Sequence, residues 1–391
     1  MNYFIILLVA IFLTSSFFFI GALSLTKVGF LLFLVLFLLM FLKNRKLSIK
    51  VDVLDVSIFL TLVLAIFSQY RTADLNESWP IVQSYIYYFI LYGVTRIYFY
   101  NYPRYINIAL KSLVIAVLVS CVFGILQFVT GFGYMPGTPI RSISTGGVFR
   151  ACGLFDDPNY FGLVLACVWP FCLIFKNVKL KYVFCSIFIL SILLTLSRAT
   201  LLILLIQVVF IFHSKSSDKS LFIIRLLIIM AFAIPLFIVI KPAFLIERMS
   251  TLLPLISGNI GELENSSAER VDLIFSGINM FLDYPFLGLG FGNFQLYTEQ
   301  YMSFFPRKVF AHNSYLTVLA ELGILGFTIW FIPLFITFKR LNKESCIFGA
   351  CLIGLFLSYF FLVAIYFQFI AFFLALLITS YQKGLIGIIK L

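Results

Sequence analysis

Residues 310–327 read FAHNSYLTVLAELGILGF, and the apolar run that continues from this stretch decides the fold class. A run this apolar belongs inside a membrane, where backbone polar groups are satisfied only within helices or closed barrels. His312, one of two histidines in the chain, stands just before the run. The sequence therefore predicts a transmembrane helix with a titratable imidazole at its mouth.

The composition of the whole chain is typical of a polytopic membrane protein. Hydrophobic residues make up 62% of the 391 residues and charged residues 11%, and the mean hydropathy is +1.10. Soluble domains do not reach this apolar content. We predict an all-α fold with about twelve transmembrane helices, each long enough to cross a core of about 30 Å. The expected spans are 3–20, 26–42, 53–69, 81–100, 108–130, 159–175, 182–197, 199–213, 221–240, 314–338, 346–365 and 367–382.

The charged residues predict the orientation of these spans. With the N-terminus in the cytoplasm, 18 of the 28 Lys and Arg residues lie inside, but only four of the 16 Asp and Glu residues do. This asymmetry follows the positive-inside rule and places both termini in the cytoplasm. It also accounts for the net charge of +12, so no nucleic-acid partner is expected. Seven of the ten basic residues left outside are arginines, which favours an anionic, phosphate-bearing substrate on the outer face.

Two predicted outer loops are long enough to hold a site. Residues 131–158 are rich in glycine and proline, and residues 241–313 form the larger loop, between the ninth and tenth spans. Within the larger loop, residues 267–283 repeat apolar side chains at helical spacing, with a polar opposite face. We expect an amphipathic helix here that lies at the membrane surface.

Three outer arginines are candidate phosphate ligands. Arg198 interrupts about thirty apolar residues at a tight turn, where an unpaired charge is costly, and no acidic residue is nearby in the sequence. Arg270 lies near the edge of the apolar stripe of the amphipathic helix, facing a boundary with protein or lipid. Arg150 precedes Asp157, which together with Pro158 forms a predicted helix start. For each arginine the alternative is a solvated or salt-bridged side chain.

His312 and Glu321 are the candidate proton-transfer groups. Asn313 and Ser314 can cap the helix that follows His312, and the positive end of its dipole disfavours imidazolium, so a neutral imidazole can accept a proton. The alternative for His312 is a structural hydrogen bond. Glu321 lies within the span, where a carboxylate needs a partner, and it serves either a structural or a direct role. No metal-ligand spacing is visible, and neither a metal nor another cofactor is expected.

The order of four motifs resembles the bacterial O-antigen ligase and Wzy-type O-antigen polymerase family. The motifs are FRACGLFDDPNYFG (149–162), SRAT (197–200), SAERVDLIFSGINMFLDYPFLGLGFGNF (267–294) and AHNSYLTVLAELGILG (311–326). The resemblance implies the helical membrane glycosyltransferase type of fold in the bacterial inner membrane, with the active site on the periplasmic side. It also implies that Arg198, Arg270 and His312 correspond to essential residues of such enzymes. The donor would be an oligosaccharide on undecaprenyl pyrophosphate.

The candidate residues suit this chemistry on their own terms. A sugar pyrophosphate carries its leaving group, so the site must neutralise a departing diphosphate and accept a proton from the attacking hydroxyl. Arg198, Arg270 and Arg150 suit the first task, and His312, or alternatively Glu321, suits the second. The resemblance implies inversion at the anomeric carbon without a metal.

Three functions are compatible with this sequence. A polymerase joins lipid-linked repeat units, with a chain-length regulator as a further expected partner, and the compact outer loop favours this function. A ligase transfers the finished glycan to a lipid A-core acceptor. A transporter of lipid-linked glycans is disfavoured because no repeat relates the two halves of the chain and its polar groups gather on one face.

Overall fold

The fold is built almost entirely of helices. The computed structural model describes residues 2–14, 19–20, 23–43, 47–131, 149–215, 265–304 and 306–385. The helices are α1 (Asn2–Leu13), α2 (Leu25–Lys43), α3 (Val53–Phe67), α4 (Leu75–Asn101), α5 (Ile106–Thr130), α6 (Pro158–Val168), α7 (Val178–Leu194), α8 (Arg198–Lys215), α12 (Asn265–Asp283), α13 (Phe294–Tyr301), α14 (Ser314–Glu344), α15 (Cys346–Ser358) and α16 (Gln368–Gln382). Short 3-10 helices η1 (Ser68–Arg71), η2 (Pro103–Tyr105) and η3 (Trp169–Ile174) and a small antiparallel hairpin of β1 (Phe19–Ile20) and β2 (Leu23–Ser24) complete the described elements.

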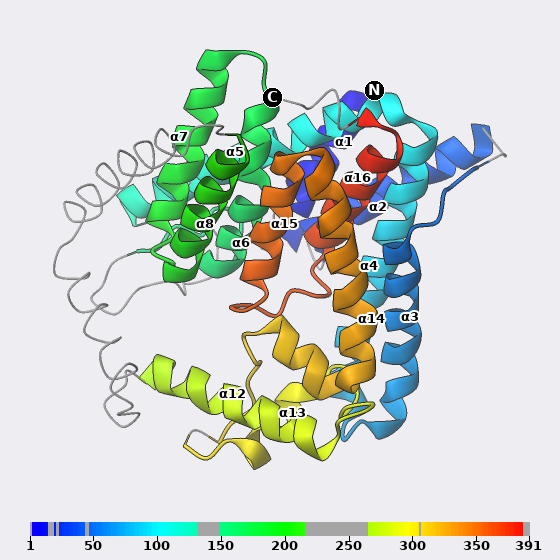
Figure 1. The fold of residues 1–391 in the computed structure, drawn as a ribbon, viewed down its shortest axis with the longest axis vertical. Helices are drawn as coiled ribbons and strands as arrows, with labels where there is room; N and C mark the ends of the chain where they lie inside the picture. Colours follow the sequence, from blue (N-terminus) through cyan, green and yellow to red (C-terminus); the bar gives the residue numbers. More distant parts are fainter. Residues whose placement is uncertain are drawn as a thin grey trace.

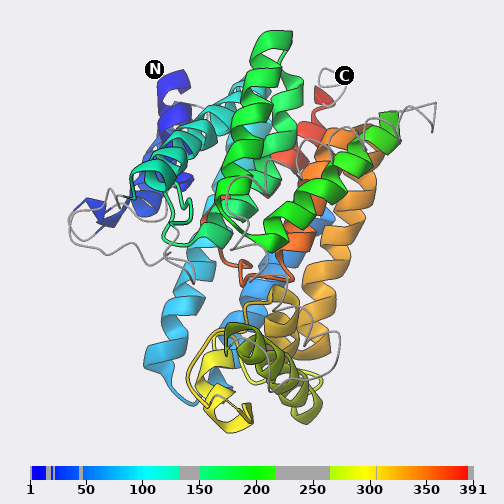
Figure 2. The ribbon, with the colours of Figure 1, turned by 90° about the vertical axis from the view of Figure 1, so that its left-hand side faces the viewer.

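The apolar helices form a bundle, and α12 and α13 lie across one end of it (Figures 1 and 2). The start of α1 and the end of α16 lie at the opposite end. The two ends of the described chain therefore share one side of the bundle.

Three helical stretches are long and apolar enough to cross a membrane. They are residues Val53–Arg71, Pro103–Thr130 and Ser314–Glu344. The other apolar helices of the described chain are shorter or contain more polar residues, and the predicted ninth span, 221–240, lies outside the described residues. The chain is thus a membrane protein by its helices, while the count of twelve spans stays a prediction.

Two predicted spans are shorter as helices than their hydropathy indicates. The stretch 346–365 is helical only as far as Ser358, after which a buried irregular segment leads to α16. Ser314 supplies hydrogen-bond partners for the backbone of this segment. Its hydroxyl donates to the carbonyl of Leu362 at 2.6 Å and accepts from the amide of Ala364 at 2.9 Å. In the stretch 3–20, α1 ends at Leu13, and Phe19–Ile20 forms β1. Hydropathy reports burial from water and does not by itself distinguish these conformations.

A buried ion pair joins three helices of the bundle. Arg96 of α4 is fully buried and donates two hydrogen bonds to Asp55 of α3, at 2.9 and 2.8 Å. It also donates to Thr379 and Gln382 of α16. Each donor of a buried guanidinium needs such a partner, so this cluster fixes the packing of α3, α4 and α16.

A kink in α14 positions the glycine-rich segment 286–292. Gly323 takes a left-handed conformation (φ 62°), and the backbone of Phe286 passes so close that a Cβ on Gly323 would lie 2.4 Å from it. Beside the kink, the amides of Leu289 and Gly290 donate to the carbonyls of Ala320 and Glu321 at 2.9 and 2.8 Å. The absence of a side chain at Gly323 therefore admits this loop against α14.

Replacing Gly323 with alanine should therefore destabilise the protein. The left-handed conformation alone costs a residue with a Cβ about 1–2 kcal/mol, and the contact with Phe286 adds to this. The matched control is Gly93→Ala in α4, where nothing lies within 4 Å of the added carbon. Thermal unfolding in detergent should show a clearly lower Tm for Gly323→Ala and a Tm near that of the wild type for Gly93→Ala. Equal Tm values for the two variants would contradict this account of the kink.

Candidate active site

His312 lies between α13 and α14, at the N-terminus of α14. Asn313 is the N-cap of this helix, and its side chain accepts from the amide of Leu316 at 3.0 Å. The amide of Ser314 donates to the carbonyl of Tyr359 at 2.7 Å, which ties the start of α14 to the end of α15. These contacts fix the backbone on the C-terminal side of His312, and Ala311 is buried on the other side.

The backbone of His312 is strained and its ring is accessible. His312 has a φ of 50°, and only one other non-glycine residue of the described chain, Leu196, has a positive φ. Left-handed conformations outside glycine cost free energy and concentrate at functional sites. The side chain is exposed, and neither ring nitrogen forms a hydrogen bond with a described residue. The structural hydrogen bond that the sequence allows for His312 is therefore not found in this part of the chain.

Arg270 of α12 is the cation that acts on His312. Partial burial lowers the pKa of His312, and the positive charge of Arg270 lowers it further; Asp157 and Glu269 act in the opposite direction. Glu269 itself accepts a hydrogen bond from Arg307 at 2.9 Å. Arg270 is exposed and forms no ion pair or hydrogen bond with any described residue. An accessible guanidinium and a neutral imidazole thus lie within electrostatic range of each other.

The turn between α7 and α8 carries Arg198 and holds Arg150. Leu196 of this turn has a φ of 51°, and Arg198 is the exposed first residue of α8. Arg150 donates from Nε to the carbonyl of Thr195 in the same turn at 2.8 Å. The amide of Ala151, the residue after Arg150, also donates to the carbonyl of Leu194 at 2.9 Å. These contacts bring Arg150 and Arg198 to one turn, although 48 positions separate them in the sequence.

The N-terminus of α6 connects this turn to His312. Asp157 caps α6 and accepts from the amide of Asn159 at 2.6 Å, as the sequence predicts. The side chain of Asn159 accepts from Nη2 of Arg150 at 3.3 Å. The charge of Asp157 also acts on His312, so the N-terminus of α6 lies within electrostatic range of the imidazole. The sequence identifies Asp157 only as a cap; its effect on His312 depends on tertiary structure.

Glu321 faces the glycine-rich segment. Its side chain is 3% exposed and accepts from the amide of Phe294 at 2.9 Å. Its carbonyl accepts from Gly290 at 2.8 Å. Gly288 and Gly290 have φ values of 67° and 105°, and the segment also receives Arg71, which donates to the carbonyl of Gly288 at 2.9 Å. The buried carboxylate of Glu321 therefore has a structural role, since it satisfies an amide of this loop.

Helix α12 buries a mixed face against the protein, with Leu273 and Met280 beside Asp272 and Ser276. Asp272 and Ser276 are buried, and Asp272 accepts from the amides of Ser303 and Phe304 at 3.0 and 2.9 Å. The opposite face exposes large apolar side chains, namely Ile274, Phe275, Ile278 and Leu282. The structure thus has the predicted amphipathic helix, starting at Asn265 rather than 267. Its exposed apolar side chains suit a lipid surface, while Leu273 and Met280 pack into an apolar cluster of the protein.

Lysine should be a poor substitute for Arg198. If the guanidinium holds a diphosphate through two parallel hydrogen bonds, Arg198→Lys keeps the charge but loses this geometry. We expect a loss of glycan transfer of roughly tenfold or more, measured with purified protein. Arg104→Lys is the control. Arg104 lies in η2, directly after α4, and this variant should retain full activity. A fully active Arg198→Lys variant would mean that the site needs only positive charge.

Comparison with known proteins supports the resemblance drawn from the motifs. Residues 183–331 match the family model described as O-antigen ligase. This range includes Arg198, Arg270, His312 and Glu321, whereas Arg150 precedes it. No curated protein matches the chain. The match thus supports, for this part of the chain, a likeness to the O-antigen ligase and Wzy-type family.

Proposed function

We propose that this protein is a membrane glycosyltransferase that polymerises oligosaccharide repeat units carried on undecaprenyl pyrophosphate. The observation that carries the proposal is the pairing of Arg270 with His312: an exposed arginine without a partner among the described residues beside an accessible imidazole whose pKa is lowered. An anion and a proton donor are the two species that this pair is suited to receive. The family match to O-antigen ligases supports the same chemistry.

In the proposed reaction, a hydroxyl of the acceptor glycan attacks the anomeric carbon of the donor. His312 accepts the hydroxyl proton while the new glycosidic bond forms, and the bond from the anomeric carbon to the pyrophosphate oxygen breaks. Arg270 and Arg198, with Arg150 beside Arg198, neutralise the negative charge on the departing lipid pyrophosphate. Attack opposite the leaving group inverts the configuration. Since arginines supply the positive charge, we propose that the reaction is independent of metal.

A membrane setting suits this substrate. The exposed apolar face of α12 rests on the lipid surface in our proposal, so Arg270 lies at the level where a lipid pyrophosphate leaves the bilayer. The polyprenyl tail can then stay in the membrane while the head group reacts. We place this face on the periplasmic side of the bacterial inner membrane and both termini in the cytoplasm, as the positive-inside rule favours.

A ligase that transfers the glycan to lipid A-core is the second candidate, because the matching family model is described as O-antigen ligase. Purified protein in detergent with EDTA distinguishes the two. Given the lipid-linked repeat unit alone, a polymerase produces a ladder of lengths. A ligase consumes the donor only when lipid A-core is added. If neither acceptor leads to donor consumption, yet the lipid crosses vesicle bilayers, the protein is a transporter and the proposal is wrong.

The pH dependence of transfer follows from the charges around His312. Neutral imidazole is the active form, so activity should fall as the pH drops through the pKa of His312, which lies below its usual value of 6.5. Arg270 lowers this pKa, while Asp157 and Glu269 raise it. Asp157→Asn removes one negative charge but keeps a good N-cap. The variant should therefore lose activity at a lower pH than the wild type. A shift to higher pH in the pH profile of kcat/KM would contradict the assignment of His312 as the base.

A further inference from the structure

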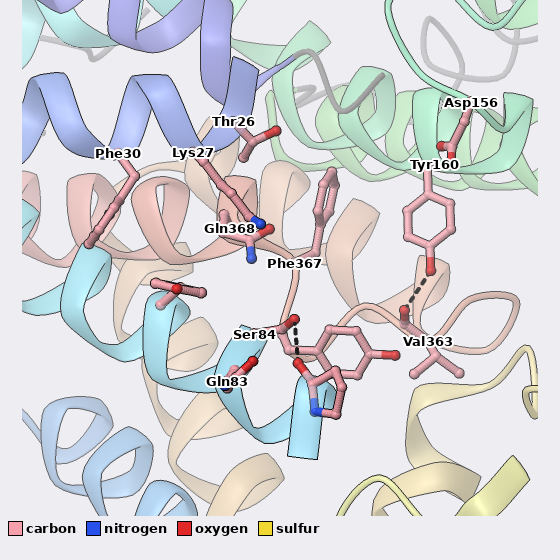
Figure 3. Close-up of a pocket in the computed structure, with 13 residues that line it drawn as sticks. Thr26, Lys27, Phe30, Gln83, Ser84, Asp156, Tyr160, Val363, Phe367 and Gln368 are labelled. Atoms are coloured by element: carbon pink, nitrogen blue, oxygen red, sulfur yellow. Dashed lines mark hydrogen bonds between the residues drawn. The ribbon is translucent and has the colours of Figure 1, made fainter. Parts of the chain in front are cut away.

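A cavity lies between α2, α4, the start of α6 and the start of α16, beside the irregular segment that follows α15. Its volume is about 510 Å³, within the usual range of small-molecule sites. Figure 3 shows its side chains, with Lys27 of α2 beside Gln368 of α16 and with Gln83 and Ser84 on α4. The lining residues are Thr26, Lys27, Phe30, Pro80, Gln83, Ser84, Tyr87, Asp156, Tyr160, Val363, Tyr366, Phe367 and Gln368.

The lining combines hydrogen-bonding groups with aromatic rings. Two of its amides, those of Gln83 and Gln368, form no side-chain hydrogen bond with any described residue, so their donors and acceptors are available to a ligand. Its charged side chains are one lysine and one aspartate, so the cavity has no excess of positive charge. A neutral ligand with many hydroxyl groups and an apolar ring face fits this lining. Sugars have both properties.

The cavity is adjacent to the candidate active site. Asp156 and Tyr160 line it, and Asp157 between them acts on the pKa of His312. The hydroxyl of Tyr160 donates to the carbonyl of Val363 at 2.8 Å. Val363 packs in one apolar cluster with Ala311, the residue that precedes His312. Thus α6 and the irregular segment after α15 connect the cavity to the imidazole.

We propose that this cavity binds sugar residues of a glycan substrate. The inference rests on the proposed glycosyltransferase function and adds a second subsite, separate from the arginines that hold the pyrophosphate. Gln83 and Gln368 contribute hydrogen bonds to sugar hydroxyls, and Tyr87, Tyr366 and Phe367 contribute ring surfaces. Sugars of the acceptor and sugars of the donor share this chemistry.

Binding of a free oligosaccharide tests the proposal. The probe is the oligosaccharide that mild acid releases from the lipid-linked pool of the host, titrated by calorimetry against purified His312→Ala protein, which prevents turnover. Adding Gln83→Leu or Gln368→Leu removes an amide at nearly constant size. Each should weaken binding roughly three- to tenfold, as expected for one lost hydrogen bond. Gln300→Leu, at an exposed position of α13, is the matched control and should leave the Kd unchanged.

An unchanged Kd in both cavity variants would overturn the proposal. So would a His312→Ala protein that does not bind the oligosaccharide, provided that the wild type transfers glycan. Gln83→Asn, which keeps an amide, should bind better than Gln83→Leu, and this order separates a lost hydrogen bond from misfolding.

One equivalent of lipid-linked oligosaccharide then identifies the source of the sugars. Displacement of the probe assigns the cavity to the donor, and simultaneous binding assigns it to the acceptor. Oligosaccharide binding without any glycan transfer would reject the proposed function and retain the sugar site.

Discussion

Arg270→Ala should lower the rate of glycan transfer by a hundredfold or more while the protein still inserts into the membrane. Arg270 is exposed on α12 and has no ion pair among the described residues, so its loss leaves no buried charge behind. Removing one charged donor from a developing anion typically costs roughly 3 kcal/mol, which corresponds to about two orders of magnitude in rate. The measurement is donor consumption by purified protein at saturating acceptor.

Lys308→Ala is the control for this variant. Lys308 is a second outer cation, and it forms an exposed salt bridge with Glu77 at 2.8 Å. Pairs of this kind contribute little to stability, and the proposed reaction makes no use of Lys308. Near-normal transfer by Arg270→Ala, or an equal loss in Lys308→Ala, would reject the role of Arg270 in charge neutralisation.

His312→Ala should reduce transfer by roughly two to four orders of magnitude, the usual contribution of a general base. The exposed ring makes no hydrogen bond with the described part of the chain, so the substitution removes no structural contact found there. Alanine keeps a Cβ, so the substitution leaves the left-handed strain in place and removes only the proton acceptor. The loss should appear in kcat at saturating donor.

His213→Ala is the matched control, because His213 is the other histidine of the chain and lies near the end of α8. It should transfer glycan at the rate of the wild type. If His312→Ala keeps most of its activity, another group accepts the proton, and Glu321 becomes the residue to test next.

The individual candidates could be predicted from the sequence because their local patterns have a direct physical meaning. The caps at Asp157 and Asn313 and the amphipathic pattern of 267–283 all appear in the structure. Their arrangement could not be predicted. That Arg150 reaches the turn before Arg198, and that Asp157 acts on His312, depends on how α6 packs beside α7, α8 and α15.

The limits of hydropathy are clearest in two places. The segment after Ser358 is as apolar as a span, yet it is irregular, and the hydroxyl of Ser314 satisfies two of its backbone groups. Asp272 of α12 is buried, although it is charged, because it pairs with amides 31 and 32 positions away. The cavity beside α4 has no sequence signature either, since α2, α4, α6 and α16 each supply only a few of its residues.

In the proposed reaction Arg270 holds the lipid pyrophosphate and His312 accepts the proton. Binding of the lipid donor separates these two roles. Undecaprenyl-pyrophosphate-linked oligosaccharide is titrated against purified wild type, Arg270→Ala and His312→Ala in EDTA, with transfer measured on the same samples. We expect His312→Ala to bind the donor like the wild type without transferring it. Arg270→Ala should bind the donor at least tenfold more weakly. Donor binding that is unchanged in Arg270→Ala and lost in His312→Ala would contradict these two roles.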